Sequence, residues 1–142
     1  LTLLNLIKRD FGLGEVDLKT LSPLTLAFVG DCIYDLILRT VIVERHNASP
    51  NQLHREKSRL AKAPAQAEMA EVLQEHLTQE ELAVYRRGRN AKSHTTAKNA
   101  SVLDYRKATG LEALYGWLYL SGQEERLLQL LRLSLDELGW KL

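Results

Sequence analysis

Two acidic residues stand in segments of the chain that are otherwise apolar. Asp31 lies in the run of residues 24–38, and Glu112 is the one charged residue of the run 108–120. Burying a lone carboxylate costs several kcal/mol unless it is paired, protonated or bound to a cation. Each acid therefore needs a chemical partner.

Glycines accompany both acids. Gly30 directly precedes Asp31, and Gly116 follows Glu112 by four residues, although glycine inside a helix costs about 1 kcal/mol relative to alanine. A patch without side chains lets a second helix or a substrate come close. If the two segments cross there, their carboxylates converge and repel unless a proton or divalent cation lies between them. Hard oxygen donors suit Mg²⁺, or Mn²⁺ as the second option, and water activated on such an ion could attack a phosphodiester.

A purely structural interpretation of the same acids stays open. An acid in an apolar helix is commonly paired with an arginine, and Arg39 and Arg106 are available. Asp35, one turn after Asp31, is either a further metal-ligating residue or a solvated one. The spacing alone does not decide between these alternatives.

The segment 86–107 is strongly basic. It carries seven cations and one acid, Asp104, whereas the whole chain has 19 Lys and Arg against 18 Asp and Glu. The segment is either a solvated loop or a site for a polyanion, because Arg, Lys, Asn, Ser and Thr are the side chains that contact nucleic-acid phosphates. Tyr85 and Tyr105 only flank it, so the segment lacks aromatic side chains on which single-stranded bases could stack. The backbone of a nucleic-acid duplex is therefore the better candidate ligand.

The elements that must position these residues are helices, because apolar residues recur at helical spacing nearly everywhere. We predict an all-α protein of about seven helices in a single domain over residues 1–142. Ser22 and Ser49, each followed by proline, and Thr78 with Glu81 mark three helix starts. The expected helices are a short one ending near residues 12–14, then 23–45, 50–62, 64–77, a segment ending at Gly88, one capped by Asp104 and running to Leu120, and 124–138.

Composition excludes several other classes of protein. The lone Cys32 rules out a disulfide framework and a cysteine-rich zinc site, and favours a reducing compartment, so we expect a cytoplasmic protein. The longest apolar stretch, 24–43, is interrupted by three charges, so we expect no membrane span. The sequence also lacks a phosphate-binding glycine loop, a nucleophile elbow and a Rossmann fingerprint.

Several separated motifs together resemble the ribonuclease III family, and most closely its Mini-ribonuclease III branch. LAFVGD at 26–31 is similar to the family's signature helix, and LEALYGWLYL at 111–120 to its second acidic helix. Between them stand RGRNAKS at 87–93, KNA at 98–100 and YRKATG at 105–110. The resemblance covers roughly residues 20 to 135.

The resemblance implies an all-helical, homodimeric endoribonuclease that cuts double-stranded RNA with Mg²⁺. It maps Asp31 and Glu112 onto metal-binding acids and Phe28 onto the aromatic that inserts into the partner subunit. It implies maturation of the large-subunit (23S) ribosomal RNA precursor, and no double-stranded-RNA-binding domain. From its place one turn after Asp31, we add Asp35 as an accessory metal ligand. The expected RNA contacts are Arg87, Arg89, Asn90, Lys92, Ser93, Lys98 and Asn99.

The chain also departs from the larger enzymes of that family. Leu24, Ala27 and Thr109 stand where those enzymes carry further acids. Fewer anionic ligands imply weaker metal binding and more retained water, which Mg²⁺ accepts readily. The missing acids leave a non-catalytic RNA-binding relative of the same fold as one alternative, and a helical protein-interaction module as another.

Overall fold

A computed structural model describes residues 1–92 and 101–142 of the chain. In these two ranges it contains α-helices and two short 3₁₀ turns, and no strand, which confirms the all-α prediction. The elements are α1 (Leu3–Asp10), η1 (Leu18–Thr20), α2 (Pro23–Arg45), α3 (Pro50–Ala61), α4 (Ala63–Leu73), η2 (Gln74–His76), α5 (Gln79–Asn90), α6 (Val102–Leu120) and α7 (Glu124–Leu138).

Local hydrogen bonds start three of these helices where the sequence predicts. The Ser22 hydroxyl accepts from the Thr25 backbone N–H at the start of α2, and the Ser49 hydroxyl accepts from Gln52 at the start of α3. At α5, Thr78 and Glu81 form a reciprocal capping box. These bonds satisfy backbone donors that the first turn of a helix leaves free.

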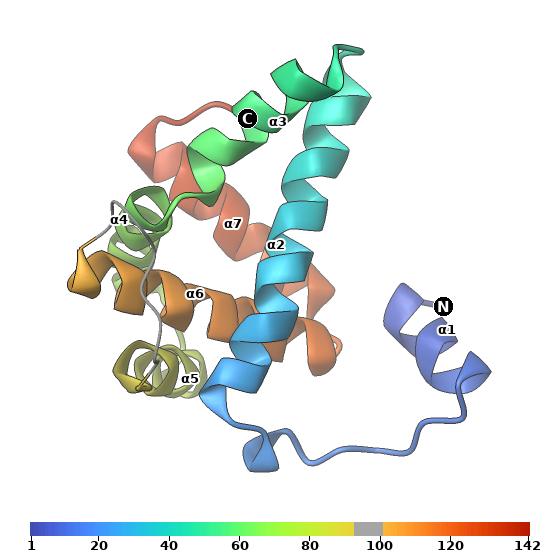
Figure 1. Cartoon of the computed structure of the whole chain (residues 1–142). Helices are drawn as coiled ribbons and strands as arrows, with labels where there is room; N and C mark the ends of the chain where they lie inside the picture. Colours follow the sequence, from blue (N-terminus) through green and yellow to red (C-terminus); the bar gives the residue numbers. More distant parts are fainter. Residues whose placement is uncertain (93–100) are drawn as a thin grey trace.

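Helix α6 is the centre of the fold. Figure 1 shows it running across the molecule, with α2 crossing it, α4 and α5 beside it, and α7 behind. Apolar residues surround α6 on most sides, as expected of a helix enclosed by others. The core around it contains Tyr34 and Tyr115, whose rings stack with centroids 5.9 Å apart. Figure 1 places α1 to one side of this body.

Three predicted helix ends are wrong. Ser101, not Asp104, caps α6: the Ser101 hydroxyl accepts from the Asp104 N–H at 3.0 Å, so Asp104 lies in the first turn. Helix α5 continues past Gly88 to Asn90 because Gly88 is a packing position, where a Cβ would lie 2.8 Å from the Ala113 Cβ. The predicted helix 64–77 ends as α-helix at Leu73 and tightens into η2.

None of the helices in the two described ranges is long and apolar enough to cross a membrane.

Candidate functional site

Helices α2 and α6 meet backbone to backbone at the two glycines. A Cβ on Gly30 would lie 1.7 Å from the carbonyl oxygen of Glu112, and one on Gly116 would lie 2.0 Å from that of Leu26. No side chain fits in either place. The predicted crossing is therefore present, and it brings Asp31 and Glu112 from distant parts of the sequence to one point.

The carboxyl groups of Asp31 and Glu112 share a side-chain hydrogen bond. Asp31 is exposed to solvent, whereas Glu112 is partly buried on α6. Burial, then the hydrogen bond and the negative charge of Asp31, raise the pKa of Glu112 to about 9. Near neutral pH the pair therefore holds a proton, with the Glu112 hydroxyl donating to the Asp31 carboxylate, unless a cation takes its place.

Helix α4 adds a third side chain to this pair. Gln66 is only 3% exposed, and its side chain is hydrogen-bonded to Glu112, an interaction that lowers the pKa of the acid. Gln66 is not among the site residues predicted from the sequence. The signal was available, because Gln66 occupies the helical stripe of buried Met69, Ala70 and Leu73, where an apolar residue is expected.

Asp35 belongs to a separate group of charges. Its Oδ2 accepts from the Arg39 Nε at 2.6 Å, and its Oδ1 lies 3.0 Å from the Lys57 Nζ of α3. Partial burial raises the pKa of Asp35, but the hydrogen bonds from Lys57 and Arg39 outweigh burial and hold that pKa below its ordinary value. Both oxygens of Asp35 are thus engaged by cations.

The structural alternative for the two acids is not observed. Arg39 is paired with Asp35, and no cation among residues 1–92 and 101–142 forms an ion pair with Asp31 or Glu112. The chain also brings no cluster of three or more His, Cys, Asp or Glu side chains together in that part. The donor set is two carboxylates, which suits an ion that keeps most of its water, as Mg²⁺ does.

Leu24, Ala27 and Thr109, where the resemblance implies acids in the larger enzymes, all carry uncharged side chains. Ala27 is buried, and Thr109 is 7% exposed with its hydroxyl donating to the Tyr105 carbonyl at 2.9 Å. Leu24 is 38% exposed on α2. None of these side chains can provide a negatively charged ligand.

Most of the predicted RNA contacts that the structure describes lie at the end of α5 rather than in a loop. Arg87 and Asn90 are exposed on its last turns, and Lys92 is exposed just beyond them. Arg89 lies over the ring of Tyr85, 5.7 Å from its centroid, and its Nε donates to the Asn90 Oδ1 at 3.3 Å. The predicted contacts Ser93, Lys98 and Asn99 lie outside the described residues.

Two cations at the start of α6 differ in availability. Lys107 pairs with Glu71 of α4, with 2.7 Å between the Nζ and the Oε1. Arg106 is exposed to solvent. In this part of the described structure, exposed cations therefore lie at the end of α5 and at Arg106 of α6.

Phe28 is 81% exposed although it stands in an apolar segment of α2. It lies three residues before Asp31, so it shares the exposed side of the helix with that acid. The expected contact of Phe28 with a partner subunit requires a ring that is exposed in the single chain, as this one is.

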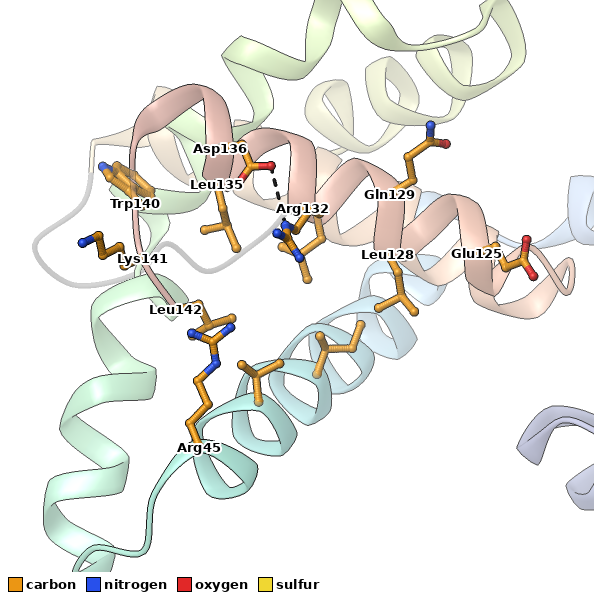
Figure 2. A pocket seen from close by; sticks show the side chains of 13 residues that line it. Arg45, Glu125, Leu128, Gln129, Arg132, Leu135, Asp136, Trp140, Lys141 and Leu142 are labelled. Carbon is orange, nitrogen blue, oxygen red and sulfur yellow. Dashed lines mark ion pairs between the residues drawn. The ribbon is translucent and has the colours of Figure 1, made fainter.

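A groove of about 610 Å³ lies elsewhere, between α2 and α7 (Figure 2). Its lining includes Leu128, Arg132 and Trp140, with Arg45 at its edge. Neither Asp31 nor Glu112 borders it. The carboxylate pair therefore lies outside this groove.

Comparisons with known proteins agree with this arrangement. The family model for the Ribonuclease III domain matches residues 24–123, which include α2, both acids and α6. A crystal structure of a Fusobacterium nucleatum protein has the same fold, with a TM-score of 0.78 and 26% identity over 87% of this chain and 98% of that one. The fold and site thus define an endoribonuclease domain of the ribonuclease III class.

Its relatives narrow the class further. The Mini-ribonuclease 3 of Thermoanaerobacter sp. (strain X514) is 51% identical over 82% of each chain. That of Clostridium tetani is 42% identical over 90% of this chain and 88% of the relative. The chain belongs to the Mini-ribonuclease 3 family. It is an endoribonuclease for double-stranded RNA, and its class generally uses a divalent metal ion.

Proposed function

We propose that this enzyme cleaves the double-stranded parts of the large-subunit (23S) ribosomal RNA precursor with Mg²⁺, or Mn²⁺ in its place, held by Asp31 and Glu112. The observation that carries the proposal is the convergence of these two carboxylates, from α2 and α6, with no cation of the described residues paired to either. Two touching carboxylates that share one proton are a ready exchange site for a divalent ion.

The three acids near the site would have different roles. Asp31, which is exposed, offers oxygens at the surface where a phosphodiester arrives. Glu112 would give up its proton on metal binding, because the charge of the ion would offset the cost of keeping the carboxylate partly buried. When bound, the ion supplies a Lewis acid that lowers the pKa of water and neutralises charge on the phosphate. Asp35 stays with Arg39 and Lys57 as a support of α2 against α3.

The duplex would bind through the basic end of α5. Arg87, Asn90 and Lys92 are exposed there and can contact phosphates without reading bases. We include Arg89, Ser93, Lys98 and Asn99 in the same RNA surface. Phe28 would join two copies into a homodimer in which each active site cuts one strand.

A cleavage assay on long duplex RNA tests the proposal. Wild-type protein should cut with Mg²⁺ and stop with chelator, while Asp31→Asn and Glu112→Gln should each lose at least about 100-fold in rate but keep binding RNA. Glu68→Gln, at an exposed carboxyl of α4, is the matched control and should cut normally. Wild-type rates in both site variants would remove the two acids from the chemistry.

A further inference from the structure

The buried amide of Gln66 is a polar group beside the site that has no role in a metal site formed by Asp31 and Glu112 alone. Gln66 is 3% exposed, in the first half of α4, and its neighbours on the same stripe belong to the core. Leaving an amide buried without a partner costs about 1–3 kcal/mol. Among the described residues, its side chain is hydrogen-bonded to the carboxyl of Glu112.

Other polar groups beneath the site are already committed. The Tyr34 hydroxyl donates to the Leu60 carbonyl at 2.6 Å, also lies 3.3 Å from the Met69 sulfur, and is buried. Tyr34 therefore offers its proton to the backbone and not to Glu112. Besides the exposed Asp31, the buried Gln66 is the described side chain that is hydrogen-bonded to the Glu112 carboxyl.

An amide is the side chain that this place requires. It can donate an N–H to the ionised Glu112 and accept from the protonated one, so the same contact serves the metal-free and the loaded enzyme. A lysine or arginine there would add a positive charge and compete with the cation. Groups that orient ligands in this way commonly change metal affinity or activity by about 10- to 100-fold when removed.

We propose that Gln66 is a positioning residue for the metal site: its amide fixes the Glu112 carboxylate so that one of its oxygens faces Asp31 and the ion. This inference rests on the proposed function, since it assumes that Asp31 and Glu112 hold the ion. It adds a third chain element, α4, to a site that would otherwise depend on α2 and α6 alone.

The test compares Gln66→Met with Gln74→Met. Methionine keeps the length of the side chain and removes the amide. Gln74 directly follows α4 in the sequence, and its Nε2 donates to the Ala70 carbonyl at 3.0 Å. The control variant Gln74→Met therefore also loses one hydrogen bond. Gln66→Met should raise the Mg²⁺ concentration for half-maximal cleavage about 10-fold or more, with the KM for RNA unchanged. Gln74→Met should leave that concentration unchanged.

Direct binding separates positioning from a merely structural role. Mn²⁺ titration followed by electron paramagnetic resonance, without RNA, should show an affinity for Gln66→Met that is lower by the same factor. A merely structural role would lower the melting temperature of both variants alike and leave Mn²⁺ affinity intact. Wild-type Mn²⁺ affinity in folded Gln66→Met overturns the inference.

The wild-type protein gives a second measurement that needs no variant. Addition of Mg²⁺ should shift the side-chain amide resonances of Gln66 in a nitrogen-15 spectrum and leave those of Gln74 in place. Unshifted Gln66 resonances at saturating Mg²⁺ overturn the inference even if Gln66→Met does not fold. Failure of the proposed function looks different: Asp31→Asn and Glu112→Gln would then bind Mn²⁺ as tightly as the wild type.

Discussion

A Cβ on Gly30 would lie 1.7 Å from the carbonyl oxygen of Glu112. The residue beside one acid of the site is thus in contact with the backbone of the other acid. Because backbone cannot move aside as a flexible side chain can, the distance between α2 and α6 at this point is set by the absence of a single methyl group. Stability and site geometry therefore depend on the same contact.

Gly30→Ala should consequently damage both properties. Forcing an extra carbon into a packed contact costs about 1–3 kcal/mol, and this overlap with backbone belongs at the upper end. We expect a melting temperature lower by several degrees, measured by calorimetry, and a cleavage rate reduced beyond what the lost stability explains. Gly14→Ala is the control, because nothing lies within 4 Å of a Cβ there. A stable, fully active Gly30→Ala would show that the helices can separate without disturbing the acids.

The convergence of Asp31 and Glu112 could be predicted because its signals are local. Each acid interrupts an apolar run, and each run carries a glycine where a mid-helix glycine is unfavourable. The residues that surround the two acids could not be predicted in the same way, because their contacts join distant parts of the sequence. Asp35 looked ambiguous because Lys57, which engages one of its oxygens, comes from α3, 22 residues later (57 − 35).

Helix ends show the same division between local and distant causes. The starts at Ser22, Ser49 and Thr78 depend on hydrogen bonds within four residues, so the sequence predicts them. Gly88 looked like a helix stop, but it continues α5 because α6 packs against it. The sequence marks Gln66 only as a polar residue in a buried helical stripe, and its contact with Glu112 depends on another helix that the local pattern does not predict.

Glu112→Gln should stabilise the metal-free protein, and more so as the pH rises. The pKa of Glu112 is about 9 in the folded chain against 4.5 for the ordinary group. Between these values the folded state holds a proton that the unfolded state has lost, so wild-type stability falls as pH rises through this window, by at most about 1.4 kcal/mol per pH unit. Glutamine does not titrate. The difference in melting temperature between variant and wild type, in chelator, should therefore be larger at pH 8 than at pH 5.

Glu68→Gln again provides the comparison for this stability measurement. It replaces an exposed carboxyl on α4 by an amide of the same shape. Its melting-temperature difference should not grow with pH. A Glu112→Gln difference that is equally flat between pH 5 and pH 8 would mean that the carboxyl is already ionised in the folded, metal-free enzyme.

Charge reversal at the end of α5 should weaken RNA binding and reduce its dependence on salt. Arg87 and Lys92 are exposed, and each phosphate contact that is lost lowers the salt slope by about 1. Filter binding of duplex RNA over a range of KCl concentrations would measure both effects for Arg87→Glu and Lys92→Glu. Arg132→Glu, on α7 at the groove of Figure 2, is the matched control. Equal salt slopes in all three variants would remove the end of α5 from the RNA surface.

If the proposed homodimer forms through Phe28, Phe28→Ala should convert it to monomers without unfolding the chain. The ring is 81% exposed in the single chain, so the fold does not depend on it. Burying a phenylalanine against a partner contributes about 1.5–3 kcal/mol, and a symmetric dimer buries two. Their loss amounts to about 3–6 kcal/mol, or about a 10²- to 10⁴-fold weaker dimer by sedimentation. Phe11→Ala removes another aromatic, 77% exposed, beside α1 and should leave the dimer intact. Because Phe28 lies near Asp31 on α2, the monomer should also cleave RNA more slowly. An unchanged dimer dissociation constant in Phe28→Ala would place the subunit contact on another face.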